Sequence, residues 1–260
     1  MQLIKARCRE NDAGSSLVEL MIGITIGMMI IASTLTIYAT TGYGASATLG
    51  SAKLNVELRG AMDVMVEDIR RAGFGRDGAT LTFMSSNSDI AVYDSDADNV
   101  NDCVVYSYQP PSGVVTTFGF RIVENVVRMR NSSANLTGTV ADCTTANAWE
   151  ALTDANTVII DAIESGANYF DISYQCLLAN RPTGATIATT SPASQSCTAG
   201  SSLYDEAAVQ ATATSTPIAL VEIRYVSIRL EGHLTQDDSM RMALAQSVMV
   251  RNHRIEMLNP

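Results

Sequence analysis

The chain has 260 residues, of which 47% are hydrophobic and 17% charged, a balance that excludes wholesale disorder. Its formal net charge is −10, which disfavours direct nucleic-acid binding because that function needs a basic surface to neutralise phosphates. The one local basic cluster, formed by Arg70, Arg71 and Arg76, fits the polar side of a helix end better. We therefore expect a folded protein that makes no direct contact with nucleic acid.

The N-terminal part of the chain is suited to cross a membrane. No charged residue occurs from Leu20 to Ala52. As a helix that rises ~1.5 Å per residue, Leu20–Ala39 alone would span about 30 Å of hydrocarbon. Lys5, Arg7 and Arg9 precede this segment and predict that the N-terminus stays in the cytoplasm while the rest of the chain lies outside.

Three interpretations fit this segment. An ordinary secretory signal could be cut after Ala47, because Ala45-Ser46-Ala47 has the small residues that a signal peptidase requires. The segment could instead remain as an uncleaved anchor. The third interpretation, a prepilin signal, depends on Glu19, because a carboxylate at the edge of a spanning helix costs roughly 3 kcal/mol in lipid and by default has a functional partner.

The residues around Glu19 resemble the processing motif of prepilins, Gly14-Ser15-Ser16-Leu17-Val18-Glu19. The resemblance implies that a dedicated peptidase cuts after Gly14, that Ser15 becomes the methylated N-terminus where the family usually has phenylalanine, and that Glu19 is the fifth mature residue. In a low-dielectric helix bundle, Glu19 would supply the counter-charge for the new amine of Ser15 on a neighbouring chain. Loss of residues 1–14 removes three basic and two acidic residues and leaves a net charge of −11.

The helix is expected to continue beyond the membrane. Within the apolar part, Gly23 and Gly27 form a GxxxG pattern that lets two helices approach closely. Farther on, apolar residues recur at steps of three and four and predict an amphipathic stripe: Leu54, Leu58, Ala61, Met65, Ile69 and Ala72. Gly73-Phe74-Gly75 supplies a stop, so we predict one long helix over residues 15–75, with residues 17–39 in the membrane.

Residues 76–260 have the shorter periodicity of a β-rich domain. The predicted strands are Asp89–Tyr93, Cys103–Tyr108, Phe118–Val123, Val126–Arg130, Val158–Ile163, Tyr169–Tyr174, Ala219–Leu230 and Ser239–Val250. The last two would form a hairpin around a turn at Gly232–Asp238, and a switch in the apolar alternation near Tyr225 predicts a bulge or bend. Leu178–Pro217 is expected to be a long exposed loop. The fold class is therefore α+β, a long helix packed on an antiparallel sheet.

The cysteines point to an oxidising compartment. Without Cys8 in the leader, four remain, and they form no CxxC pair of a zinc or redox site. This pattern fits two disulfides in the periplasm, and of three possible pairings we favour the sequence neighbours, Cys103 with Cys143 and Cys176 with Cys197. Free buried thiols are the alternative.

An acidic run over residues 94–102 has oxygen ligands at alternate positions, as a calcium loop does. A calcium ion there would use Asp94, Asp96, Asp98 and Asp102 together with the Val100 carbonyl. The twelfth position, Val105, is no bidentate acid, so a solvated acidic turn is the favoured alternative. No other cofactor is expected, because the GxGxxG match at Gly73–Gly78 closes a helix and does not follow a strand.

Two further motifs carry a family resemblance. Asp68-Ile69-Arg70-Arg71-Ala72-Gly73-Phe74 resembles the helix-end signature of PilW-type minor pilins of type IV pili, and Val248-Met249-Val250-Arg251-Asn252 resembles their final strand. The resemblance implies a subunit near the pilus tip that helps to start pilus assembly. Its implied partners are other minor pilins, the major pilin, a tip adhesin, the prepilin peptidase and the inner membrane, before the subunit reaches the cell-surface pilus.

Other functions stay open at this point. A J-like pseudopilin of a type II secretion system shares the same leader and architecture, and a secreted calcium-binding or adhesive module would follow from cleavage after Ala47. We expect no enzyme activity: His233 and His253 lie outside any catalytic motif, and no nucleophile elbow, metalloprotease motif or P-loop occurs.

Overall fold

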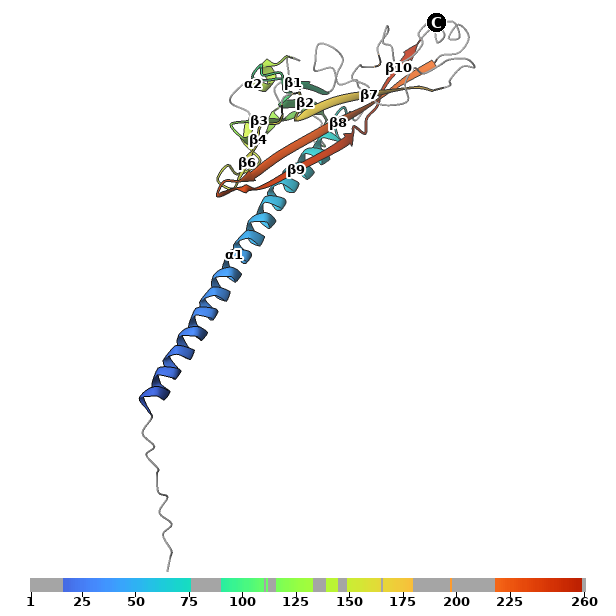
Figure 1. Ribbon diagram of the computed structural model, residues 1–260. Helices are drawn as coiled ribbons and strands as arrows, with labels where there is room; N and C mark the ends of the chain where they lie inside the picture. The colour runs from blue at the N-terminus through green and yellow to red at the C-terminus, as the bar shows by residue number, and fades with distance from the viewer. Residues whose placement is uncertain are drawn as a thin grey trace, which may run out of the picture. The chain divides into compact units, whose positions relative to one another are not determined.

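A computed structural model describes residues 16–75, 90–109, 111, 116–132, 139–144, 149–164, 166–179, 197 and 218–258. The chain divides into two compact units, residues 1–50 and 51–260. Helix α1 (Leu17–Ile69) supplies the described part of the first unit and the beginning of the second (Figure 1). The processing residues Gly14 and Ser15, and all of the expected loop Leu178–Pro217 except Cys197 and the last two residues of a strand, lie outside the described residues.

The amphipathic stripe of α1 is confirmed. All six predicted positions are buried, and Met62 and Val66 join them in the core. The helix ends at Ile69 and not at the predicted residue 75, because the N–H groups of Arg71 and Ala72 bond three residues back, to Asp68 and Ile69, in a tighter final turn. Gly73 then takes a φ of 74°, a left-handed conformation that closes helices and suits glycine.

The first sheet of the β-rich unit is antiparallel and follows chain order. It consists of β1 (Ile90–Tyr93), β2 (Cys103–Tyr108), β3 (Thr116–Val123), β4 (Val126–Ser132) and β5 (Trp149–Ala151). A two-residue turn joins β3 to β4, and Glu124 and Asn125 both have positive φ, as such tight hairpins require. The short helix α2 (Ala141–Thr144) precedes β5.

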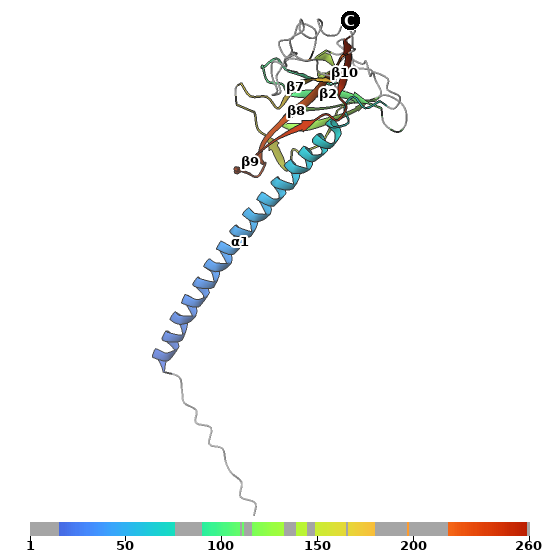
Figure 2. The same ribbon diagram turned by 90° about the vertical axis from the view of Figure 1, so that its right-hand side faces the viewer.

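The second sheet is organised around β8 (Ile218–Leu234), the longest strand. One edge of β8 pairs with β7 (Phe170–Ala179) and β6 (Val158–Ile160); the other pairs with β9 (Asp237–Met249) and β10 (Arg254–Leu258). Figure 1 shows β8 between β7 and β9. Side chains from both sheets and from the C-terminal turns of α1 form one hydrophobic core, and Figure 2 shows those turns against the strands.

The expected bulge at Tyr225 is wrong. Pairing of β8 with β7 and with β9 continues through Tyr225, and the register shift lies at His233 and Leu234. The alternation never changes phase, because every even-numbered residue from Leu220 to Leu234 is buried, including the charged Glu222 and Arg224. Because the buried positions 222 and 224 hold charged residues, the apolar pattern in the sequence changes phase near Tyr225, although the buried face of the strand does not change. The predicted turn at Gly232–Asp238 is also too long, because β8 continues to Leu234 and β9 starts at Asp237.

Candidate functional site

The first half of α1 is an apolar surface with no cover from the described part of the chain. From Leu17 to Leu49 its large hydrophobic side chains are at least half exposed, and it is the one described helix long and apolar enough to cross a membrane. Every serine and threonine from Thr25 to Thr48 donates its hydroxyl to a carbonyl of its own helix. These polar groups are thus satisfied internally, as lipid or a helix bundle requires.

Glu19 is the exception on this surface. It lies in the first turn of α1, where an acid interacts favourably with the helix dipole, and no described side chain contacts its carboxylate. Gly23 and Gly27 follow on the same helix, and an added Cβ at either one would meet nothing within 4 Å. No described residue therefore covers this end of the helix.

At its other end, α1 is tied to β2 by Asp68. The Tyr106 hydroxyl donates to Asp68 Oδ2 over 2.6 Å, and the Tyr108 hydroxyl donates to Asp68 Oδ1 over 3.0 Å. Tyr106 is fully buried, and this burial, with the adjacent Asp68 charge, raises the pKa of Tyr106 well above its usual value. The Arg71 guanidinium lies 3.5 Å from Asp68 Oδ1. Asp68 thus accepts hydrogen bonds from the hydroxyls of two buried tyrosines.

The two sequence motifs of the PilW resemblance meet at this junction. The Gly73 N–H donates to the Ser107 carbonyl over 2.8 Å, beyond the last turn of α1. The Asn252 side chain donates to the Ala72 carbonyl over 3.1 Å, and the Arg251 N–H donates to the Arg70 carbonyl over 3.2 Å. Carbonyls at a helix C-terminus lack intrahelical partners, so the segment after β9 caps them.

Replacing Asp68 by alanine is expected to lower the free energy of unfolding by about 2–3 kcal/mol, because it leaves the buried Tyr106 hydroxyl without an acceptor. Denaturant unfolding of the full chain in detergent would measure this loss. Asp68→Asn keeps an acceptor oxygen and should lose less, and Asp63→Ala, at an exposed position on the same helix, is the matched control. Equal losses for Asp68→Ala and Asp63→Ala would contradict the assignment.

Both favoured cysteine pairs are disulfides. Cys103 joins Cys143 with a Cα–Cα distance of 6.2 Å, and Cys176 joins Cys197 with 5.7 Å. The first bridge holds α2 on the side of the first sheet that faces away from α1, where Cys103, Val105, Cys143 and Trp149 form a small core of their own. Arg121 lies over the Trp149 ring, 5.0 Å from its centre, and Arg130 donates to the Asp142 carbonyl over 2.8 Å.

The acidic loop brings three of its four candidate ligands together. The carboxylates of Asp94, Asp96 and Asp98 lie within 4.8 Å of one another, whereas Asp102 is buried and accepts hydrogen bonds from the N–H and hydroxyl of Ser95. Desolvation opposes the ionisation of Asp94, but hydrogen bonds from several backbone N–H groups, Asn99 first among them, together lower its pKa. Hydrogen bonds to its own carboxylates thus close this loop, and calcium binding stays a prediction.

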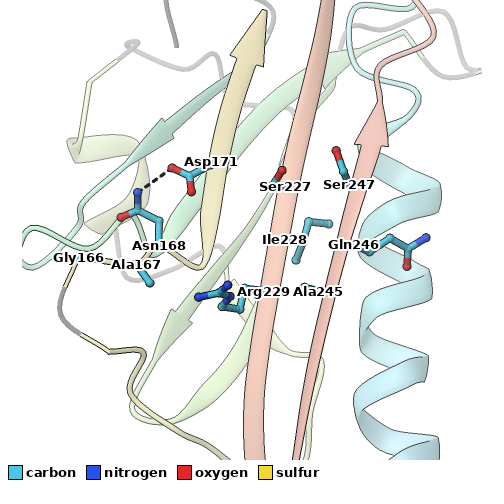
Figure 3. Close-up of a pocket in the computed structure, with 10 residues that line it drawn as sticks. All are labelled: Gly166, Ala167, Asn168, Asp171, Ser227, Ile228, Arg229, Ala245, Gln246 and Ser247. Carbon is cyan, nitrogen blue, oxygen red and sulfur yellow. Dashed lines mark hydrogen bonds between the residues drawn. The ribbon is translucent and has the colours of Figure 1, made fainter. Parts of the chain in front are cut away.

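A hollow of about 510 Å³ lies on the outer face of the second sheet (Figure 3). Its lining includes Ser227 and Arg229 from β8 and Gln246 from β9, while Asp171 accepts a hydrogen bond from Asn168 over 2.7 Å. No histidine or cysteine lines it. Elsewhere, His233 Nδ1 lies 2.7 Å from Asp161 Oδ1, a pairing that the sequence did not reveal.

A family model described as prepilin peptidase-dependent protein B matches residues 47–250, well over half of the chain. The chain belongs to this family. No curated protein and no solved structure gives a significant match. Membership in the prepilin peptidase-dependent protein B family confirms the type IV pilin-related minor pilin that the sequence motifs indicated, and it makes the chain a pilin-like component of a pilus or secretion system.

This family is one of structural, pilin-like proteins and no known enzyme class. The matched segment begins after the leader, Glu19 and most of the apolar helix, so the assignment is independent of the processing motif. Sequence reasoning missed the part that Asn252 plays at the end of α1. Both motifs resemble family signatures, which singled them out in the sequence, but no local pattern indicated that they meet.

Proposed function

We propose that this prepilin peptidase-dependent protein is a PilW-like minor pilin of a type IV pilus. A prepilin peptidase removes residues 1–14, Ser15 becomes the methylated N-terminus, and the apolar half of α1 holds the chain in the inner membrane with its β-rich domain in the periplasm. The subunit then joins other minor pilins, the major pilin and a tip adhesin near the pilus tip, where it helps to start assembly.

The main support is the exposed apolar helix with a single acid, Glu19, at its start, joined to a domain of a prepilin peptidase-dependent family. Such a helix can leave the bilayer only if other helices cover it, which a filament core provides. Ala45-Ser46-Ala47, the site of the competing secretory interpretation, lies inside the unbroken α1, so cleavage there would cut a continuous helix. This observation favours the prepilin route.

The proposal predicts a protein that starts at Ser15. Intact and peptide mass spectrometry of the chain from its native membrane would measure the N-terminus and its methylation. A start at Thr48 would indicate ordinary secretion, and an intact Met1 would indicate a simple anchor; both would contradict the proposal. Gly14→Leu, which puts a bulky side chain at the cleavage site, should leave the leader attached, and Gly42→Leu, within α1, is the matched control.

The J-like pseudopilin remains the alternative for the same architecture. Deletion of the gene separates the two: loss of surface pili with intact protein secretion supports the pilus subunit, and loss of secretion with intact pili supports the pseudopilin.

A further inference from the structure

The end of α1 borders a hollow of about 550 Å³, here called the helix-end pocket. It combines three arginines with an apolar floor, and its lining is Arg70, Arg71, Phe74, Tyr108, Gln109, Pro111, Arg251 and Asn252. We propose that the helix-end pocket binds an acidic segment of a partner protein that places a carboxylate next to an apolar side chain.

The charge of the helix-end pocket suits an acidic partner. The chain carries 27 acidic and 17 basic residues, yet three of its arginines gather here. Arg71 pairs with Asp68, whereas no carboxylate of the described residues lies within 4.0 Å of the guanidinium of Arg70 or Arg251. Arg251 is exposed and Arg70 half-buried, so both can reach a ligand. Two guanidinium groups without a carboxylate partner among the described residues can bind carboxylates of another chain through paired, charge-assisted hydrogen bonds.

The apolar part of the pocket suits a hydrophobic side chain next to the carboxylate. Phe74 is 47% exposed although it lies beside a well-packed core. The lining also includes the buried Tyr108 and the exposed Pro111. An inorganic anion or a sugar would leave this surface wet, whereas a peptide with a neighbouring apolar side chain would cover it. The hollow in Figure 3 differs, because its lining holds a single arginine and no aromatic residue.

The pocket is also preorganised. Its walls come from the end of α1, the segment after β2 and the segment after β9, and hydrogen bonds hold these three together. Besides the bonds of Gly73 and Asn252 described above, the Gln109 N–H donates to the Phe74 carbonyl over 2.8 Å. A partner would therefore lose little binding energy to the ordering of this site. The pocket has the same lining whether the chain serves a pilus or a secretion system, so the proposed binding does not depend on the proposed function.

Binding is tested with the full chain in detergent and a fluorescent hexapeptide of alternating glutamate and leucine, by anisotropy. The wild type should bind it more weakly at about 0.5 M than at about 0.05 M salt, because high salt screens charge pairs. Arg70→Gln/Arg251→Gln should weaken binding roughly tenfold or more, given the usual strength of hydrogen bonds to charged groups. Phe74→Ala should weaken binding without removing the salt dependence.

The matched control is Arg59→Gln/Arg229→Gln, which removes the same charge from exposed positions elsewhere and should bind as the wild type does. Unchanged thermal unfolding of each variant shows that it is folded. The proposal is overturned if the wild type does not bind the glutamate peptide, if a glutamine–leucine peptide binds equally well, or if both double variants lose affinity equally. It is also overturned if a single-stranded DNA oligonucleotide of equal charge binds more tightly, because the site would then recognise phosphates.

Discussion

Removing the Cys103–Cys143 disulfide by paired substitution to alanine is expected to lower the free energy of unfolding by about 4 kcal/mol, because it frees a long loop in the unfolded chain. The bridge closes 40 residues of sequence that contain β3 and β4. This loss is large against the roughly 5–15 kcal/mol by which domains are usually stable. It should also release α2, whose four residues are too few to form a stable helix alone.

Trp149 reports both effects. It is the single tryptophan of the chain, it is 8% exposed, and it packs against Cys143 in the small core outside the first sheet. Denaturant unfolding followed by its fluorescence measures the stability, and a red shift of the native emission measures the release of α2. Cys176→Ala/Cys197→Ala is the matched control: it should cost about 3 kcal/mol for its shorter loop but leave the native emission of Trp149 unchanged. Equal emission shifts in both variants would contradict this division.

The second large effect is expected at Glu19. Glu19→Ala should leave membrane insertion and cleavage intact but reduce the amount of the subunit in sheared pili roughly tenfold or more, because the proposed charge pair with the Ser15 amine of a neighbouring chain would be lost. Glu19 is the one charged residue in the apolar half of α1, and no described side chain pairs with it. Quantitative immunoblots of membrane and pilus fractions would measure the change.

Controls at Glu19 separate charge from shape. Glu19→Gln keeps the size of the side chain and its hydrogen bonds but not its charge, so it should fail nearly as Glu19→Ala does, whereas Glu19→Asp should retain part of the incorporation. Glu67→Ala, at an exposed position later in α1, is the matched control and should have no effect. Normal incorporation of Glu19→Ala would refute the pairing of Glu19 with a neighbouring amine.

Several strands and the whole of α1 were predictable because their signals are local. The step of three and four from Leu54 to Ala72 indicated which face of α1 is buried, and Cys103–Tyr108 matches β2 from end to end. Where local pattern and burial disagree, the prediction was wrong: Glu222 and Arg224 are buried in β8 although their charges indicate an outer face. The short elements β5, β10 and α2 were missed, because three to five residues carry too little periodicity to stand out.

The sequence by itself determined the membrane-suited helix with Glu19, its amphipathic continuation and the β-rich domain, because each depends on spacing between residues near one another in the chain. It also favoured the observed cysteine pairs, because neighbouring cysteines close the shortest loops. Only the tertiary structure decided that Asp68 bonds Tyr106 and Tyr108 and that three arginines line one pocket. Those outcomes depend on contacts between distant segments, such as Asn252 and Ala72, which are 180 residues apart. The hydrophobic periodicity of a segment does not indicate which polar partner its side chains will contact once the end of α1, β2 and the segment after β9 pack together.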